Sequence, residues 1–177
     1  MFKWLFGGGK KSANARRRGS KEERDKRVAK GIEKIESQFK LEIPPSYKEF
    51  LRNYDQVNYL DRTCDVYADS DTQDRVLYNF MIKKFLGINP AGSEDIMKNY
   101  ENYASMLPRP ELMPIAFDQF RNIMCLDMKD GAVYFWDIQN AVDARNLTTM
   151  VQGNRLFFVA STFLDFKDRL YKISKYT

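Results

Sequence analysis

The segment IMCLDMKDGAVYFWD, residues 123–137, constrains the fold of this chain more than any other stretch. Two apolar runs flank the pair Asp130-Gly131, a strong β-hairpin signal because glycine accepts the positive φ of a tight turn. A two-residue loop would pair Leu126 with Phe135 and leave both faces of the hairpin mostly apolar. The segment therefore predicts a central hairpin in a sheet that is covered on both sides.

An aspartate ends each apolar run, which raises the question of whether Asp127 and Asp137 are catalytic. With a two-residue loop they lie on opposite faces, and with a three-residue loop they share a face but lie roughly 13 Å apart at ~3.3 Å per residue. Paired carboxylates in hydrolases work at about 5 to 9.5 Å. The chain also has no histidine, which removes any Ser-His or Cys-His pair. We therefore predict no catalytic residues, no metal site and no cofactor.

Apolar spacing predicts helices towards both ends of the chain. Val28, Ile32, Ile35 and Phe39 share one face of a helix over 21–39, with Ser20 and Glu23 as a capping box. Further helices are expected over 46–54, over 93–106 with Ser93 as the cap, and over 162–174. Strands are expected at 57–60, 64–68, 75–82, 112–117, 122–128, 132–138 and 155–161. This order predicts an α+β fold with a mainly antiparallel sheet on which N-terminal helices and a C-terminal helix pack.

Basic charge is concentrated at the start of the chain. Residues 1–30 hold eleven of the 29 Lys and Arg residues but three of the 24 acidic ones, so the remaining 147 residues carry 18 basic and 21 acidic groups. Residues 7–20 have almost no apolar side chains and a block of like charge, which favours a flexible arm. We therefore predict a flexible basic arm over 1–20 and an α+β domain over 21–177.

The arm has three interpretations. The first is a solubilising tail. The second is contact with an anionic membrane surface, because aromatic side chains stand beside lysines. The third is contact with the phosphates of nucleic acid, without reading of its sequence. The candidate contact residues are Phe2, Trp4, Phe6, Lys10, Lys11, Arg16, Arg17 and Arg18.

Three segments resemble the SUKH superfamily, to which the fungal cell-wall assembly and killer-toxin-resistance regulators belong. They are IEKIESQFKLEIPPSYKEFLRNY at 32–54, LMPIAFDQFRNIMCLDMKDGAVYFWD at 112–137, and FVASTFLDFKDRLY at 158–171. Their order along the chain makes the resemblance more specific than any single piece. The turn FDQFR at 117–121 departs from the family pattern, which commonly has a glycine-rich turn before the asparagine at position 122.

The resemblance implies a protein-binding domain and not an enzyme. Many bacterial members are similar to immunity proteins, which bind and block a cognate toxin, often a nuclease. A mildly acidic body suits such a basic partner. The densest acidic segment, formed by Asp65, Asp69, Asp71 and Asp74, would raise the association rate, and aromatic anchors such as Tyr67 or Tyr78 would provide affinity. The alternative is that the acidic segment is a solvated loop. The candidate partner contacts are Asp65, Tyr67, Asp69, Asp71, Asp74, Tyr78, Asp118 and Arg121.

The expected location is the cytoplasm. No apolar run approaches the ~18 to 20 residues of a membrane-spanning helix, and the cluster MFKWLF is too short for a signal-peptide core. Cys64 and Cys125 are expected to be reduced thiols. The alternative function is a peripheral adaptor or cell-envelope regulator that docks through its arm to the inner face of the membrane.

Overall fold

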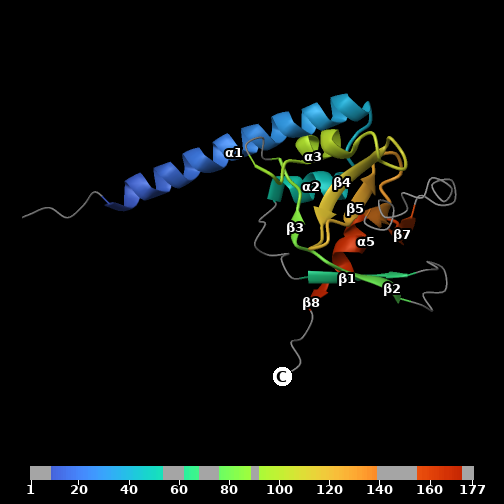
Figure 1. The fold of residues 1–177 in the computed structure, drawn as a ribbon. Helices are drawn as coiled ribbons and strands as arrows, with labels where there is room; N and C mark the ends of the chain where they lie inside the picture. Colours follow the sequence, from blue (N-terminus) through green and yellow to red (C-terminus); the bar gives the residue numbers. More distant parts are fainter. Residues whose placement is uncertain (1–8, 54–61, 68–75, 89–91, 139–154, 173–177) are drawn as a thin grey trace, which may run out of the picture.

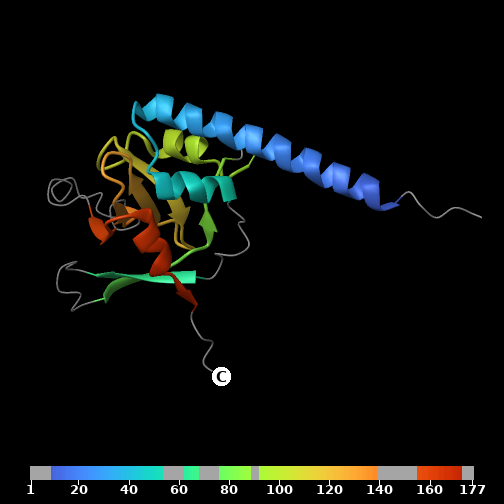
Figure 2. The same cartoon turned by 180° about the vertical axis from the view of Figure 1, so that it is seen from behind.

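The computed structural model describes residues 9–53, 62–67, 76–88, 92–138 and 155–172 of the 177-residue chain. Over these residues the protein has two antiparallel sheets with helices packed on them, which confirms the predicted α+β class. Helix α1 (Gly9–Phe39) lies at one end of the domain and the smaller sheet at the other, and the N-terminal part of α1 projects from the rest (Figure 1, Figure 2). None of the helices among the described residues combines the length and apolar character needed to cross a bilayer.

Helix α1 begins at Gly9, well before the predicted start at Lys21. Ser20 therefore lies inside the helix, and the predicted capping box with Glu23 is wrong. Lysine, alanine and arginine are good helix formers, and extending an existing helix avoids the cost of a new nucleus. For these reasons residues 9–20 continue the helix, where the sequence favoured a flexible segment. The division into an arm over 1–20 and a domain over 21–177 remains a prediction.

The inner face and the end of α1 agree with the prediction. Val28, Ile32 and Ile35 are buried against the domain. The helix ends at Phe39, as expected, and Lys40 follows with φ 54. A left-handed residue directly after the last helical turn is a common way to end a helix.

Helix α2 (Pro45–Asn53) matches the second predicted helix. Glu36 fixes its position relative to α1, because its Oε1 accepts a hydrogen bond from the Ile43 backbone N at 2.9 Å and pairs with Lys48 Nζ at 2.7 Å. The segment between the two helices is thereby held by one carboxylate.

The larger sheet has the strand order β3-β4-β5-β6-β7, with every neighbouring pair antiparallel. Strands β5 and β6 lie inside it, and all of β5 and most of β6 are buried, which confirms the prediction of a central, covered hairpin. The strands are β3 (Lys84–Phe85), β4 (Leu112–Phe117), β5 (Ile123–Asp127), β6 (Val133–Trp136) and β7 (Leu156–Ala160).

The register of this hairpin differs from the predicted one by two residues, because the loop is longer. Leu126 pairs with Val133 instead of Phe135. Asp127 closes the wider turn: its carboxylate accepts from the Lys129 backbone N and its carbonyl accepts from the Gly131 backbone N, both at 2.9 Å. Gly131 supplies the positive φ of 81 that this turn requires. A shift of two residues leaves each side chain on its predicted face.

The smaller sheet has the order β2-β1-β8, from strands β1 (Arg62–Tyr67), β2 (Val76–Met81) and β8 (Tyr171–Lys172). Strand β8 replaces the end of the predicted C-terminal helix, since helix α5 (Phe163–Asp168) stops before it. Pairing of Thr63 with Tyr171 gives this segment backbone partners that a short, frayed helix end would lack. The strand expected at 57–60 lies outside the described residues.

Helix α3 (Ile96–Tyr103) begins at a different cap from the one predicted. Asp95, and not Ser93, has the extended backbone of an N-cap, and its side chain accepts from the Lys98 backbone N at 3.0 Å. The helix packs on the larger sheet through Tyr103, whose ring centroid lies 5.8 Å from that of Phe117.

Aromatic side chains join the two sheets. Phe80 and Tyr78 of β2 contact Phe135 of β6, with ring centroids 5.9 and 4.8 Å apart. Phe163 and Phe166 of α5 are fully buried in the same core. Strand β2 is thus fixed against the larger sheet by its inner face, and its other face is left for the surface.

Candidate functional site

The turn between β4 and β5 is organised by the buried carboxylate of Asp118. One oxygen, Oδ1, accepts from the backbone N of Phe120 and of Asn122, both at 2.8 Å. Arg121 in the same turn has φ 66, a left-handed conformation that residues other than glycine rarely adopt. The hydrogen bonds of Asp118 hold an arginine here in a conformation that glycine would take freely.

The second oxygen of Asp118 belongs to a closed set of hydrogen bonds that we call the inner triangle: Tyr78, Asp118 and Asn122. The Tyr78 hydroxyl donates to Asp118 Oδ2. Asn122 Nδ2 donates to Asp118 Oδ2 and to the Tyr78 hydroxyl, both at 3.1 Å. Asp118 is 4% exposed, Asn122 is 3% exposed and Tyr78 is half-buried, so the triangle lies mostly in the protein interior.

Burial and bonding hold the Tyr78 hydroxyl in its neutral form. Loss of hydration raises the pKa of Tyr78 above its ordinary range, and the hydrogen bond and the charge of Asp118 raise it further. The hydroxyl of Tyr78 therefore keeps its proton while it connects strand β2 to the 118–122 turn.

A second triangle with the same three residue types lies on the smaller sheet. We call it the outer triangle: Asp65 on β1, Asn79 on β2 and Tyr171 on β8. Asn79 Nδ2 donates to Asp65 Oδ1 at 2.7 Å and to the Tyr171 hydroxyl at 3.0 Å. The Tyr171 hydroxyl donates to the same Asp65 oxygen at 2.9 Å. Each strand of the smaller sheet contributes one residue.

The two triangles lie on opposite sides of strand β2. Tyr78 and Asn79 are consecutive, and consecutive side chains of a strand point to opposite faces. Asn79 is exposed and Tyr171 is 42% exposed. Below the surface, the hydroxyl of the buried Thr63 donates to Asn79 Oδ1 at 2.6 Å. The outer triangle is therefore an ordered polar surface with a buried support.

The predicted partner contacts separate into three groups. Asp65 lies in the outer triangle, and Tyr67 is half-buried at the end of β1. Tyr78 and Asp118 lie in the inner triangle, so the Tyr78 hydroxyl is engaged inside the protein, while Arg121 is exposed. The third group lies outside the described parts of the chain and consists of Asp69, Asp71 and Asp74.

The predicted contacts of the N-terminal arm are a separate set. Those that lie outside the described parts of the chain are Phe2, Trp4 and Phe6. Those placed in α1 by their backbone alone are Lys10, Lys11, Arg16, Arg17 and Arg18.

Sequence reasoning missed four residues of this region: Asn79, Phe120, Asn122 and Tyr171. Asn79 was detectable, because it is the one polar residue within the apolar run VLYNFM. Phe120 is a large apolar side chain that is 58% exposed at the 118–122 turn. Tyr171 could not be found this way, because the sequence placed it in a helix.

The aspartates of the central hairpin are not a pair. They lie on opposite faces, as the two-residue register predicted, and each is next to an arginine: Arg109 Nη2 lies 3.1 Å from Asp127 Oδ2, and Arg155 Nη2 lies 3.0 Å from Asp137 Oδ2. Burial raises the pKa of Asp127 above its ordinary range, although Arg109 and the Lys129 backbone N oppose this shift. Both carboxylates therefore serve as internal ion-pair partners.

The described part of the chain offers neither a metal-binding cluster nor a reactive thiol. The described residues contain no group of three or more His, Cys, Asp or Glu that could hold a metal ion. Cys64 and Cys125 are buried free thiols, and burial raises the pKa of Cys64 to about 12. A thiol with so high a pKa is a poor nucleophile at neutral pH.

The chain matches a protein-family model. The model described as the SMI1 / KNR4 family (SUKH-1) matches residues 29–169, which includes both triangles except Tyr171. No curated protein and no solved structure matches the chain.

Proposed function

The chain belongs to the SMI1 / KNR4 family (SUKH-1), and from this premise we propose that it is an immunity protein that binds and neutralises a cognate bacterial toxin, such as a nuclease. The family consists generally of non-catalytic immunity or regulator domains. The ion pairs of Asp127 and Asp137 support a binding role, because they occupy the two carboxylates that were the best candidates for chemistry.

The observation that carries the proposal is the ordered outer triangle. Its three side chains are fixed by mutual hydrogen bonds before any partner arrives, so little rotamer entropy is lost on binding. Tyrosine at such a surface combines apolar area with a polar tip, which is typical of residues that dominate protein interfaces.

The charge of this surface fits a basic partner. The hydrogen bonds of the triangle use Oδ1 of Asp65, and among the described residues none reaches Oδ2. That oxygen is available to an arginine or lysine of a toxin, in a body whose residues after position 30 carry more acidic than basic groups.

Co-expression tests the proposal. The full-length protein is produced together with each toxin encoded beside its gene, and colony formation and co-purification are measured. We expect the wild type to restore growth, and Asp65→Ala and Tyr171→Phe to restore it less. Lys129→Ala, on the exposed tip of the central hairpin, is the control and should behave as the wild type. If no encoded toxin is bound or neutralised, the protein is not an immunity protein.

A further inference from the structure

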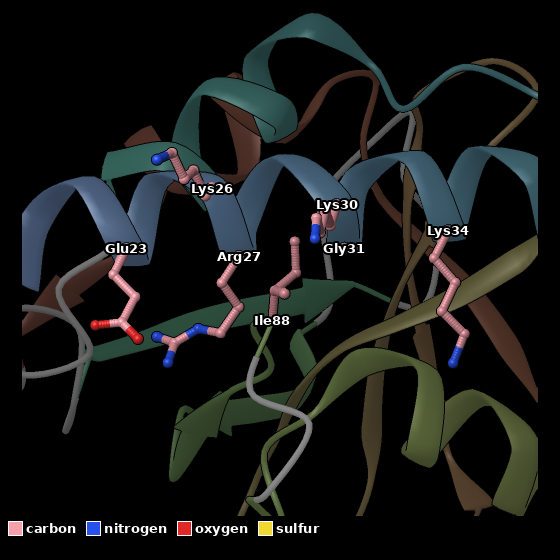
Figure 3. A pocket seen from close by; sticks show the side chains of 7 residues that line it. All are labelled: Glu23, Lys26, Arg27, Lys30, Gly31, Lys34 and Ile88. Carbon is pink, nitrogen blue, oxygen red and sulfur yellow. The ribbon is translucent and has the colours of Figure 1, made fainter.

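A basic groove lies beneath α1, away from the outer triangle. It has a volume of ≈ 410 Å³ and is lined by Glu23, Lys26, Arg27, Lys30, Gly31, Lys34 and Ile88. Figure 3 shows Ile88 directly below Gly31, with Glu23, Arg27 and Lys34 extending from the helix on the same side. The groove thus has an apolar floor and a rim made mostly of cations.

The floor depends on a close approach of two segments. A Cβ atom at position 31 would lie 2.3 Å from Ile88 Cγ2, which is far inside van der Waals contact. Glycine therefore lets Ile88 rest on the backbone of α1. The side chain of Ile88 is still half-exposed, so it presents an apolar surface to whatever enters the groove.

The rim has a surplus of positive charge. Arg27, Lys30 and Lys34 follow one another at spacings of three and four residues, which places them along one stripe of the helix. Among the described residues, none of these three has an acidic partner within 4.0 Å. Lys26 pairs with Glu22 at 2.9 Å, but both side chains are largely exposed and such a pair is weak.

We propose that this groove binds an acidic segment of another protein, with an apolar side chain of that segment on Ile88 and its carboxylates on Arg27, Lys30 and Lys34. The stripe from Glu23 to Lys34 spans roughly 16 Å at 1.5 Å per residue of helix. About five residues of extended chain at ~3.3 Å each cover this length.

Phosphate-bearing ligands fit less well. Nucleic acid would satisfy the cations but would leave the apolar floor of Gly31 and Ile88 without a matching group. A bilayer presents a broad surface, so it would contact the exposed side of α1 before it reached the groove beneath the helix. The groove differs in charge from the outer triangle, so the inference is independent of toxin binding.

The test uses a fluorescein-labelled peptide with one central leucine and three aspartates on either side, titrated with the full-length protein and followed by fluorescence anisotropy. We expect binding that weakens at least about fivefold in the double variant Lys30→Glu/Lys34→Glu, because like charges then face the peptide. A peptide with serine in place of leucine should bind about threefold more weakly, because it leaves Ile88 exposed. The control Lys98→Glu/Lys129→Glu makes the same change of net charge at exposed positions elsewhere and should bind as the wild type.

Two further probes decide between ligand classes: a single-stranded oligothymidine and vesicles that contain phosphatidylserine. Circular dichroism establishes that each variant is folded. The proposal is overturned if the wild type does not bind the acidic peptide, or if Lys30→Glu/Lys34→Glu binds it unchanged. The proposal is also overturned if Lys30→Glu/Lys34→Glu weakens the binding of oligothymidine or of the vesicles but not the binding of the peptide.

Discussion

The inner and outer triangles have the same residue types and the same pattern of hydrogen bonds, yet they lie on opposite sides of strand β2. In each, a tyrosine hydroxyl and an asparagine amide donate to one aspartate oxygen, and the amide also donates to the tyrosine. In the inner triangle Asp118 and Asn122 are buried and Tyr78 is half-buried, so water can replace a lost partner only poorly. In the outer triangle Asn79 and Tyr171 are exposed and Asp65 is half-buried, so water competes for the bonds. Because the groups are the same, it is the difference in burial that leads us to assign the inner triangle to the fold and to propose the outer one as a partner contact.

The largest expected difference between the triangles concerns their aspartates. Asp118→Ala removes the acceptor of the Tyr78 hydroxyl, the Asn122 amide and two backbone N–H groups. Leaving buried donors unsatisfied costs about 1–3 kcal/mol each, so we expect a loss of about 3 kcal/mol or more in the free energy of unfolding. Asp65→Ala should cost less than about 1 kcal/mol, because water can replace the carboxylate. Denaturant titration of both variants measures the contrast, and equal losses would remove the distinction between a structural and a surface triangle.

The tyrosines should differ in the same direction by a smaller amount. Tyr78→Phe keeps the ring contact with Phe135 but leaves Asp118 and Asn122 without the hydroxyl, for which we expect a loss of about 1–2 kcal/mol. Tyr171→Phe should cost a few tenths of a kcal/mol, about the size of a surface change. Thermal unfolding of the two variants under identical conditions gives the comparison. If Tyr171→Phe unfolds at a lower temperature than Tyr78→Phe, the expected order of the two losses is wrong.

A pH titration sharpens the same comparison. Burial first, and then Asp118, raises the pKa of Tyr78 above the ordinary value of 10.0. The folded protein therefore holds this proton more tightly than the unfolded chain, so the contribution of Tyr78 is complete below pH 10.0 and is lost as the pH rises above it. We expect the free energy of unfolding of the wild type to fall more steeply above pH 10.0 than that of Tyr78→Phe. The free energy of unfolding of both proteins is measured by denaturant titration at several pH values. If the two curves against pH run parallel, the surroundings do not raise the pKa of Tyr78.

Local patterns in the sequence were enough to predict the elements that the triangles rest on. Val28, Ile32 and Ile35 gave the inner face of α1, and the alternation around Asp130-Gly131 gave a central hairpin with the correct side chains on each face. The register was wrong by two residues, because the carboxylate and carbonyl of Asp127 capture backbone N–H groups and widen the turn. Such side-chain to backbone bonds compete with the tightest turn in a way that residue periodicity does not record.

The triangles themselves could not be predicted, because they join residues that are distant in sequence. Asp65 and Tyr171 are separated by 106 positions, and Tyr78 and Asp118 by 40. No local pattern places Tyr171 in a strand, since the spacing of Phe163, Phe166, Leu170 and Ile173 favours a helix that continues past it. Pairing with β1 ends that helix, and only this tertiary contact brings Tyr171 to Asp65.

Partner binding by the outer triangle is tested most directly by the affinity of the Asp65→Ala protein for the proposed toxin, measured by isothermal titration calorimetry beside the wild type. We expect a Kd that rises at least about tenfold, equivalent to about 1.4 kcal/mol, while the free energy of unfolding changes by less than about 1 kcal/mol. An unchanged Kd in a fully folded Asp65→Ala protein would contradict the assignment of the outer triangle to partner binding.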